Sequence, residues 1–250
     1  FLANIREVDA IVFVLRAFED DDIPGPSDPL EHLRIVEIEL ALADLETVET
    51  RLSRAQKTSR MDKSVTEEME ALERAQVHLA EGRPLYRAGI TEDDRALLAP
   101  HFLLTARRVL AVVNVAEDKI DTIPQMEALV RAELAPPGSA SANDVEVLGM
   151  SVQLEAEAAQ LTGQDRIDML EALGLGEGAL PRMVRSAYHL LGLRTYFTTG
   201  EKETRAWTFN AGAKAPECAG KIHSDLQRGF IRADVIAWDE LLEIGSWNKA

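Results

Sequence analysis

Three short runs of nearly unbroken apolar residues constrain this chain more than any other feature. They cover residues 9–16, 108–115 and 145–150, and β-branched side chains are frequent in all of them. Such runs are typical of strands that are covered on both faces, as in a parallel sheet. An amphipathic segment at 125–135 separates the second run from the third, which gives the strand–helix–strand order of a parallel unit. The sequence therefore predicts an α/β fold.

A long helical region separates the first strand from the second. Apolar residues recur at spacings of three and four from 38 to 52 and again from 65 to 79, with a polar stretch between these segments. Narrow apolar stripes of this kind indicate an antiparallel helical hairpin whose helices face each other. We predict an inserted, coiled-coil-like arm over residues 38–95. Two ordinary helices packed on the sheet are the alternative interpretation.

Residues 193–250 have a different pattern. Two strands joined by a polar turn are predicted at 195–198 and 205–209, a short helix at 216–224 and a further strand at 231–238. Two strands, a helix and a strand follow one another in this order in a β-grasp module. The sequence therefore predicts a C-terminal α+β β-grasp domain. It is expected to be incomplete, because a final strand is missing from the pattern.

The composition excludes several classes of protein. Hydrophobic residues make up 46% of the chain, which argues against global disorder. No apolar run approaches the roughly 18 residues of a membrane span, and no signal peptide precedes the first strand. The single cysteine, Cys218, excludes an intrachain disulfide and fits a cytoplasmic setting. The five histidines are scattered without the spacing of a metal site, so no metal-ligating residues are predicted.

The net charge of −16 argues against a protein that coats nucleic acid by bulk electrostatics. One segment has the opposite balance, because residues 194–232 carry seven Lys and Arg against four Asp and Glu. A basic face on this segment would suit contact with RNA or a ribosome, whereas ordinary variation within a small domain is the alternative. The candidate contact residues are Arg205, Lys214, Lys221, His223, Arg228 and Arg232.

Residues 114–117 read Asn-Val-Ala-Glu at the predicted carboxyl end of a buried strand, where ligands bind in open α/β sheets. GTPases carry Asn-Lys-x-Asp at this place, and the Asp accepts two hydrogen bonds from guanine. Glu117 replaces that Asp and Val115 replaces the Lys, which predicts a loss of guanine preference. An Asn such as Asn114 at a strand end is also ordinary turn chemistry.

These segments together resemble the YchF/Obg-like ATPase family, which are P-loop NTPases of the TRAFAC class with a C-terminal TGS domain. The resemblance is carried by residues 40–49, by 114–117 and by 198–233, and residues 1–11 resemble the family segment that follows switch II. It implies a G-domain-like core at 1–37 and 96–192, the inserted arm at 38–95 and a TGS domain at 193–250.

The resemblance also implies a function and a binding site. The family's altered Asn-x-x-Glu motif goes with a preference for ATP over GTP, so Asn114, Val115 and Glu117 are expected to frame an adenine. Ser151 and Val152 would belong to a second loop beside the base, and capping of the following helix by Ser151 is the alternative. The expected partners are ATP with Mg²⁺, and a ribosome, through its large subunit, or RNA. A monomer without membrane contact is expected.

The sequence contains no G-x-x-x-x-G-K-[ST] phosphate loop. The phosphate-binding, Mg²⁺-binding and catalytic residues are therefore expected in an N-terminal part of the family pattern that these 250 residues lack. We predict an ATPase for the intact protein and no activity for this fragment alone. Two alternatives remain: a non-enzymatic RNA- or ribosome-binding TGS module with a helical arm, and a GTP-specific Obg-like GTPase.

Overall fold

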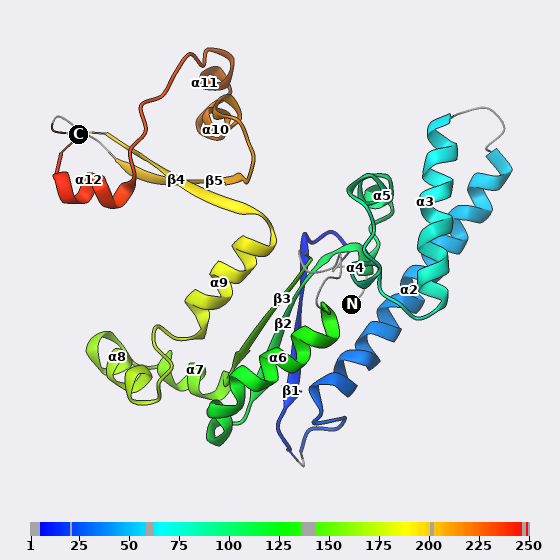
Figure 1. The fold of residues 1–250 in the computed structure, drawn as a ribbon, viewed down its shortest axis with the longest axis horizontal. Helices are drawn as coiled ribbons and strands as arrows, with labels where there is room; N and C mark the ends of the chain where they lie inside the picture. Colours follow the sequence, from blue (N-terminus) through cyan, green and yellow to red (C-terminus); the bar gives the residue numbers. More distant parts are fainter. Residues whose placement is uncertain are drawn as a thin grey trace. The chain divides into compact units, whose positions relative to one another are not determined.

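A computed structural model of the chain forms two compact units, Phe1–Leu190 and Leu191–Ala250 (Figure 1). The structure describes residues 6–20, 22–58, 63–136, 144–200, 203–246 and 249. The first five residues of the predicted segment 1–11 therefore lie outside the described part of the chain, as do Glu201 and Lys202.

The first unit contains a parallel sheet in which all three predicted strands are present. The strands β1 (Ala10–Ala17), β2 (Arg108–Val115) and β3 (Val145–Met150) lie side by side in that order. Asn114 of β2 has Arg16 as its neighbour on β1 and Met150 as its neighbour on β3. The carboxyl ends of the three strands therefore meet at one edge of the sheet. This confirms the predicted α/β fold with a parallel sheet.

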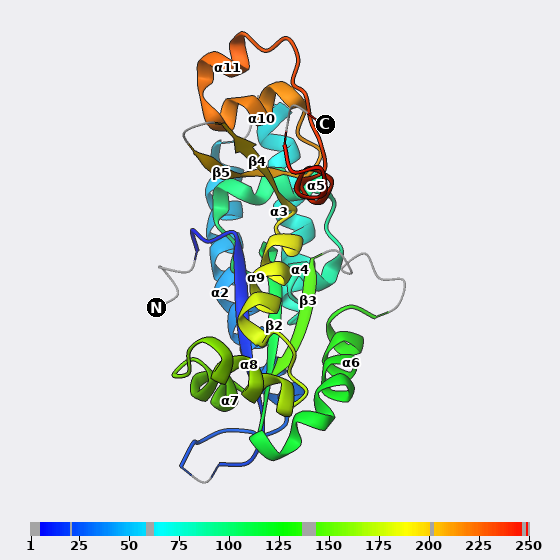
Figure 2. The same cartoon turned by 90° about the vertical axis from the view of Figure 1, so that its left-hand side faces the viewer.

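Helices cover both faces of this sheet (Figure 2). The helices α2 (Pro29–Thr58) and α6 (Ile123–Leu134) pack on one face, where the odd-numbered β2 side chains from Val109 to Val115 point into the core. On the other face α9 (Ala179–Leu190) covers Leu110 and Val112. Burial on both faces is the reason why the strand sequences read as nearly unbroken apolar runs.

The helix α2 continues beyond the sheet and pairs with α3 (Lys63–Ala80) in a helical hairpin (Figure 1). Its first half packs on β1, and its second half buries Val48 and Leu52 against Ala71, Leu72 and Ala75 of α3. The same helix thus belongs to the sheet layer and to the hairpin. The connection back to β2 contains α4 (Leu85–Ala88), α5 (Glu92–Leu98) and two 3₁₀ turns, η1 (Ala99–His101) and η2 (Leu104–Ala106).

A buried polar cluster joins α4 to the first half of α2 and to α6. The hydroxyl of Tyr86 donates to Glu37 Oε1 at 2.7 Å, and Arg87 Nη1 donates to Glu37 Oε2 at 2.8 Å. Arg87 Nη2 also pairs with Glu133 Oε1 at 2.9 Å. Burial raises the pKa of the Glu37 carboxyl, and the donors from Tyr86 and Arg87 oppose that shift. The remaining elements of the first unit are η3 (Glu117–Thr122), α7 (Val152–Ala158) and α8 (Gly163–Ala172).

The second unit is built on an antiparallel hairpin of β4 (Leu193–Thr199) and β5 (Thr204–Asn210). Tyr196 and Phe209 pack edge to face with ring centroids 5.8 Å apart. The Tyr196 hydroxyl donates to the main-chain oxygen of Cys218 at 2.8 Å, which anchors α10 (Ala215–Ile222) on the hairpin. The shorter helices α11 (Ser224–Arg228) and α12 (Trp238–Ile244) follow.

Two local predictions for this unit are wrong. The segment predicted as a strand at 231–238 forms no ladder with the described strands, and α12 begins at its last residue. Ile231 and Val235 are 90% and 88% exposed, so these apolar side chains do not pack against the described part of the unit as strand residues would. The predicted helix at 216–224 is interrupted, because His223 is extended at φ −161° and ψ 143°. No described helix is long and apolar enough to cross a membrane.

Candidate functional site

The end of β2 and the start of α7 are joined by a hydrogen bond at the carboxyl edge of the sheet. The main-chain nitrogen of Val152 donates to Asn114 Oδ1 at 3.0 Å. The first amide groups of a helix lack partners within it, so side chains, water or ligands satisfy them. Asn114 does this from the neighbouring strand. The alternative interpretation of Ser151, as a side-chain cap of α7, is wrong, because Ser151 occupies the N-cap position without making a side-chain cap.

A second contact joins the same two segments. Gln153 Nε2 donates to Glu117 Oε2 at 2.9 Å, so Asn114 and Glu117 are tied to consecutive residues of α7. Both partners of this contact are exposed. Gln153 was absent from the predicted site. Its only signal in the sequence was its position next to the predicted pair Ser151 and Val152.

The five predicted base-site residues therefore lie at one edge, but they differ in what they offer a ligand. The Val115 side chain is buried in the core beneath α6, so it offers a ligand no side-chain contact. Val152 is exposed, whereas Ser151 is 2% exposed. The Ser151 hydroxyl makes no hydrogen bond with any described residue.

This edge presents hydrogen-bonding groups of the kind that a purine base requires. The Asn114 side-chain oxygen accepts from Val152. The side-chain nitrogen of Asn114, which is a donor, has no partner among the described contacts and remains for a ligand. The buried Ser151 hydroxyl has both donor and acceptor capacity, and an unpaired buried hydroxyl is costly unless a ligand satisfies it. The residues present therefore fit a base. No cluster of metal-ligating side chains occurs in the ranges that the structure describes.

The predicted basic residues of the second unit have different surroundings. The Arg205 guanidinium lies 4.3 Å from the ring centroid of Trp207, which is a cation–π contact. Arg228 pairs with Asp225, and His223 Nδ1 accepts from the main-chain nitrogen of Asp225 at 3.1 Å. His223 thus starts α11, a local role that its sequence position did not suggest. Lys214, Lys221 and Arg232 are exposed.

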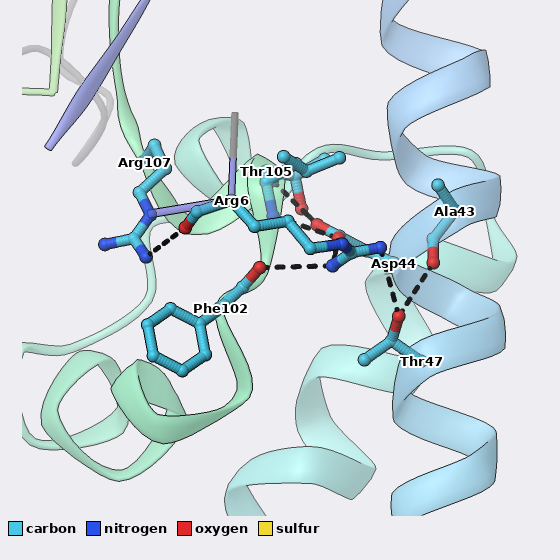
Figure 3. A network of polar contacts seen from close by, with 8 residues as sticks. Arg6, Ala43, Asp44, Thr47, Phe102, Thr105 and Arg107 are labelled. Atoms are coloured by element: carbon cyan, nitrogen blue, oxygen red, sulfur yellow. Dashed lines mark hydrogen bonds and ion pairs between the residues drawn. The ribbon is translucent and has the colours of Figure 1, made fainter. Parts of the chain in front are cut away.

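A buried carboxylate lies at the opposite edge of the sheet, where η2 meets α2 (Figure 3). Asp44 is 0% exposed and accepts from the main-chain nitrogens of Leu104 and Thr105 at 2.9 and 2.7 Å. The Thr105 hydroxyl adds a third hydrogen bond at 2.8 Å. Burial raises the pKa of the Asp44 carboxyl, and these donors oppose the shift. The sequence analysis gave Asp44 no individual role and named it only within the segment 40–49 that carries the resemblance.

Arg6 connects this carboxylate to the segment that precedes β1. Its Nη1 atom lies 3.5 Å from Asp44 Oδ1 and donates to the main-chain oxygen of Phe102 at 3.1 Å. Its Nη2 atom donates to Thr47 Oγ1 at 3.3 Å, and Arg107 donates to the main-chain oxygen of Arg6 at 2.8 Å (Figure 3). The network joins the segment before β1, the helix α2 and the connection before β2.

Comparisons with known proteins assign the chain to a family. The family model YchF-GTPase_C, described as a protein of unknown function (DUF933), matches residues 193–250. The Ribosome-binding ATPase YchF of Bacillus subtilis is 41% identical over 254 residues, and the alignment covers all of this chain and 68% of that protein. The protein of the same name from Escherichia coli O157:H7 is 37% identical, with coverages of 97% and 66%.

A solved structure agrees with these sequence relatives. The structure of the Schizosaccharomyces pombe YchF GTPase superposes with a TM-score of 0.83 and 29% sequence identity, and it covers 99% of this chain and 67% of that one. The resemblance drawn from the hairpin helix, the Asn-x-x-Glu motif and the C-terminal segment is thereby confirmed. This chain belongs to the YchF family.

Proposed function

We propose that this chain is the base-recognising and ribosome-docking portion of an ATPase. The observation that carries the proposal is the hydrogen bond from Val152 N to Asn114 Oδ1, which fixes an Asn-x-x-Glu motif at the ligand edge of a parallel sheet. The relatives named ribosome-binding ATPases support both halves of the function. In this role Asn114 donates to the base through its amide nitrogen, and Ser151 satisfies its buried hydroxyl on the same ligand.

Hydrolysis would follow the usual course of phosphoryl transfer, in which water attacks the γ-phosphate in line and positioning supplies most of the rate. Mg²⁺ would neutralise charge on the phosphates, and we assign neither its ligands nor the phosphate-binding groups to residues of this chain. The contribution proposed here for the chain is to hold the base and so fix where the phosphates lie. We infer that the 250 residues alone have no ATPase activity.

The docking half of the proposal concerns the second unit and the hairpin. We propose that residues 193–250 form a TGS domain and that residues 38–95 form a coiled-coil-like arm, inserted in a G-domain-like core at 1–37 and 96–192. We propose further that the TGS domain and the arm both contact the large ribosomal subunit. A monomeric, cytoplasmic protein fits this role. The support comes from the exposed cations at Lys214, Lys221 and Arg232 within a chain of net charge −16.

Nucleotide competition tests the base site. We expect ATP to displace a fluorescent ATP analogue from the full-length protein at a lower concentration than GTP does. Asn114→Asp keeps the acceptor for Val152 but loses the amide donor, so ATP affinity should fall about tenfold, as for one lost hydrogen bond. Asn114→Ala loses both contacts and should weaken binding further. Stronger competition by GTP than by ATP would instead support a GTPase, which is how the Schizosaccharomyces pombe protein of the solved structure is named.

Salt dependence tests the docking surface. Ribosome binding by the full-length protein is expected to weaken with salt, because cations that contact phosphates release counterions. Lys221→Ala, which removes one such contact, should reduce the slope of log affinity against log salt by about 1. Lys119→Ala, an exposed substitution in the first unit, serves as the matched control. Equal slopes for wild type and Lys221→Ala in co-sedimentation would remove Lys221 from the proposed surface.

A further inference from the structure

The Gln153–Glu117 contact bears directly on which base the site accepts, and this inference rests on the proposed nucleotide function. Guanine presents two neighbouring N–H donors, and a carboxylate reads both by offering one oxygen to each. Adenine has an amine donor beside a ring acceptor and offers no such pair. A carboxylate that recognises guanine in this way must therefore have both oxygens aligned with the base edge.

In this chain one of those oxygens already has a protein partner. Gln153 Nε2 donates to Glu117 Oε2 at 2.9 Å across the gap between η3 and α7. The contact joins two exposed side chains that belong to different segments. The Glu117 segment is fixed through Asn114, whose oxygen holds the α7 residue next to Gln153. The backbone positions that carry the two groups are therefore set independently of their own hydrogen bond.

We propose that Gln153 is a specificity-determining residue that disfavours guanine by holding the Glu117 carboxylate toward α7. Each carboxylate oxygen can accept two hydrogen bonds, so Gln153 does not occupy Glu117 Oε2 fully; it restrains the direction of the carboxylate. A rotation that aligns both oxygens with guanine has to be made against this contact. ATP demands no such rotation, because adenine does not present two neighbouring donors to a carboxylate. The Glu at this motif position and the Gln on α7 thus act together, and the Gln is the positioning member of the pair.

The test measures dissociation constants for ATP and GTP analogues on the full-reading-frame protein. Gln153→Leu keeps the size of the side chain and removes the donor. It is expected to strengthen GTP binding about three- to tenfold, as for one net hydrogen bond, and to leave ATP binding within twofold. In a Glu117→Ala background the same substitution should change neither affinity, because the carboxylate that Gln153 holds is then absent.

A matched control is present elsewhere in the first unit. Gln164 Nε2 donates to Asp168 Oδ1 at 2.7 Å in another exposed pair of amide and carboxylate on α8. Gln164→Leu should leave both affinities unchanged. An unchanged ATP-to-GTP ratio in Gln153→Leu, with ATP still bound by the wild type, would overturn the role of Gln153 alone. Absence of ATP binding by the wild type would overturn the proposed function, and this inference with it.

Discussion

Replacement of Asp44 by Ala is expected to lower the free energy of unfolding of the first unit by about 3–5 kcal/mol. The substitution leaves the main-chain nitrogens of Leu104 and Thr105 without their acceptor in a site closed to water. It also removes the carboxylate that faces the Arg6 guanidinium. Asp44→Asn keeps one oxygen acceptor, but its NH₂ group then faces one of the donors that the carboxylate accepted from. This substitution should lower the free energy of unfolding by about 1–3 kcal/mol. Urea unfolding followed by circular dichroism measures both.

Glu49→Ala is the matched control for this prediction, because Glu49 lies on the same helix and is exposed. Its effect should stay within about 0.5 kcal/mol. A loss below about 1 kcal/mol for Asp44→Ala would show that water or a shifted η2 turn satisfies the two amides. Asp44 would then have no part in holding the hairpin against the connection before β2.

The pH dependence of the Asp44→Asn penalty follows from the direction of the pKa shift. Burial raises the folded-state pKa of Asp44 above its ordinary value of 3.8. The folded state therefore holds this proton more tightly, and the resulting stability is present below pH 3.8 and is lost as pH rises through the raised pKa. The amide that Asp44→Asn introduces cannot titrate. The penalty of this substitution should accordingly be largest below pH 3.8 and smaller at pH 7, which parallel urea titrations would measure.

The elements that the sequence predicted correctly depend on local patterns. The runs at 9–16, 108–115 and 145–150 are strands because burial on both faces leaves few polar positions in a parallel sheet. Parallel strands bring their carboxyl ends to one edge, so the proximity of Asn114 and Ser151 followed from the topology. The segment at 231–238 had strand-like composition, but composition does not supply a hydrogen-bonding partner.

The features that the sequence did not reveal depend on contacts between distant residues. Asp44 receives its donors from Leu104 and Thr105, some sixty positions along the chain, and nothing in its helix pattern marks it as buried. The same reason explains the α7 cap, since local rules favour Ser151 and the neighbouring strand supplies Asn114 instead. Local patterns therefore gave the elements and their order, whereas the polar contacts between them required the three-dimensional fold.

Replacement of Gly149 by Ala is expected to destabilise the first unit by about 1–3 kcal/mol through overpacking. Gly149 lies in β3, where α6 approaches closely. A Cβ atom there would lie 2.6 Å from Ile123 Cγ2 and 3.1 Å from Glu127 Cγ. The main-chain nitrogen of Gly149 also donates to Glu127 Oε1 at 2.6 Å, and a displaced α6 would weaken that bond. Thermal or urea unfolding of the 250-residue chain measures the loss.

A double-mutant cycle separates this clash from a general loss of strand geometry at Gly149. Ile123→Ala removes the Cγ2 atom that the new methyl group would meet, so Gly149→Ala should cost at least about 1 kcal/mol less in that background. Ile123→Val keeps a methyl group at the same branch, and the full penalty should remain. An equal cost of Gly149→Ala in all three backgrounds would mean that α6 yields freely. The close approach of α6 to β3 would then not be the reason for a glycine at position 149.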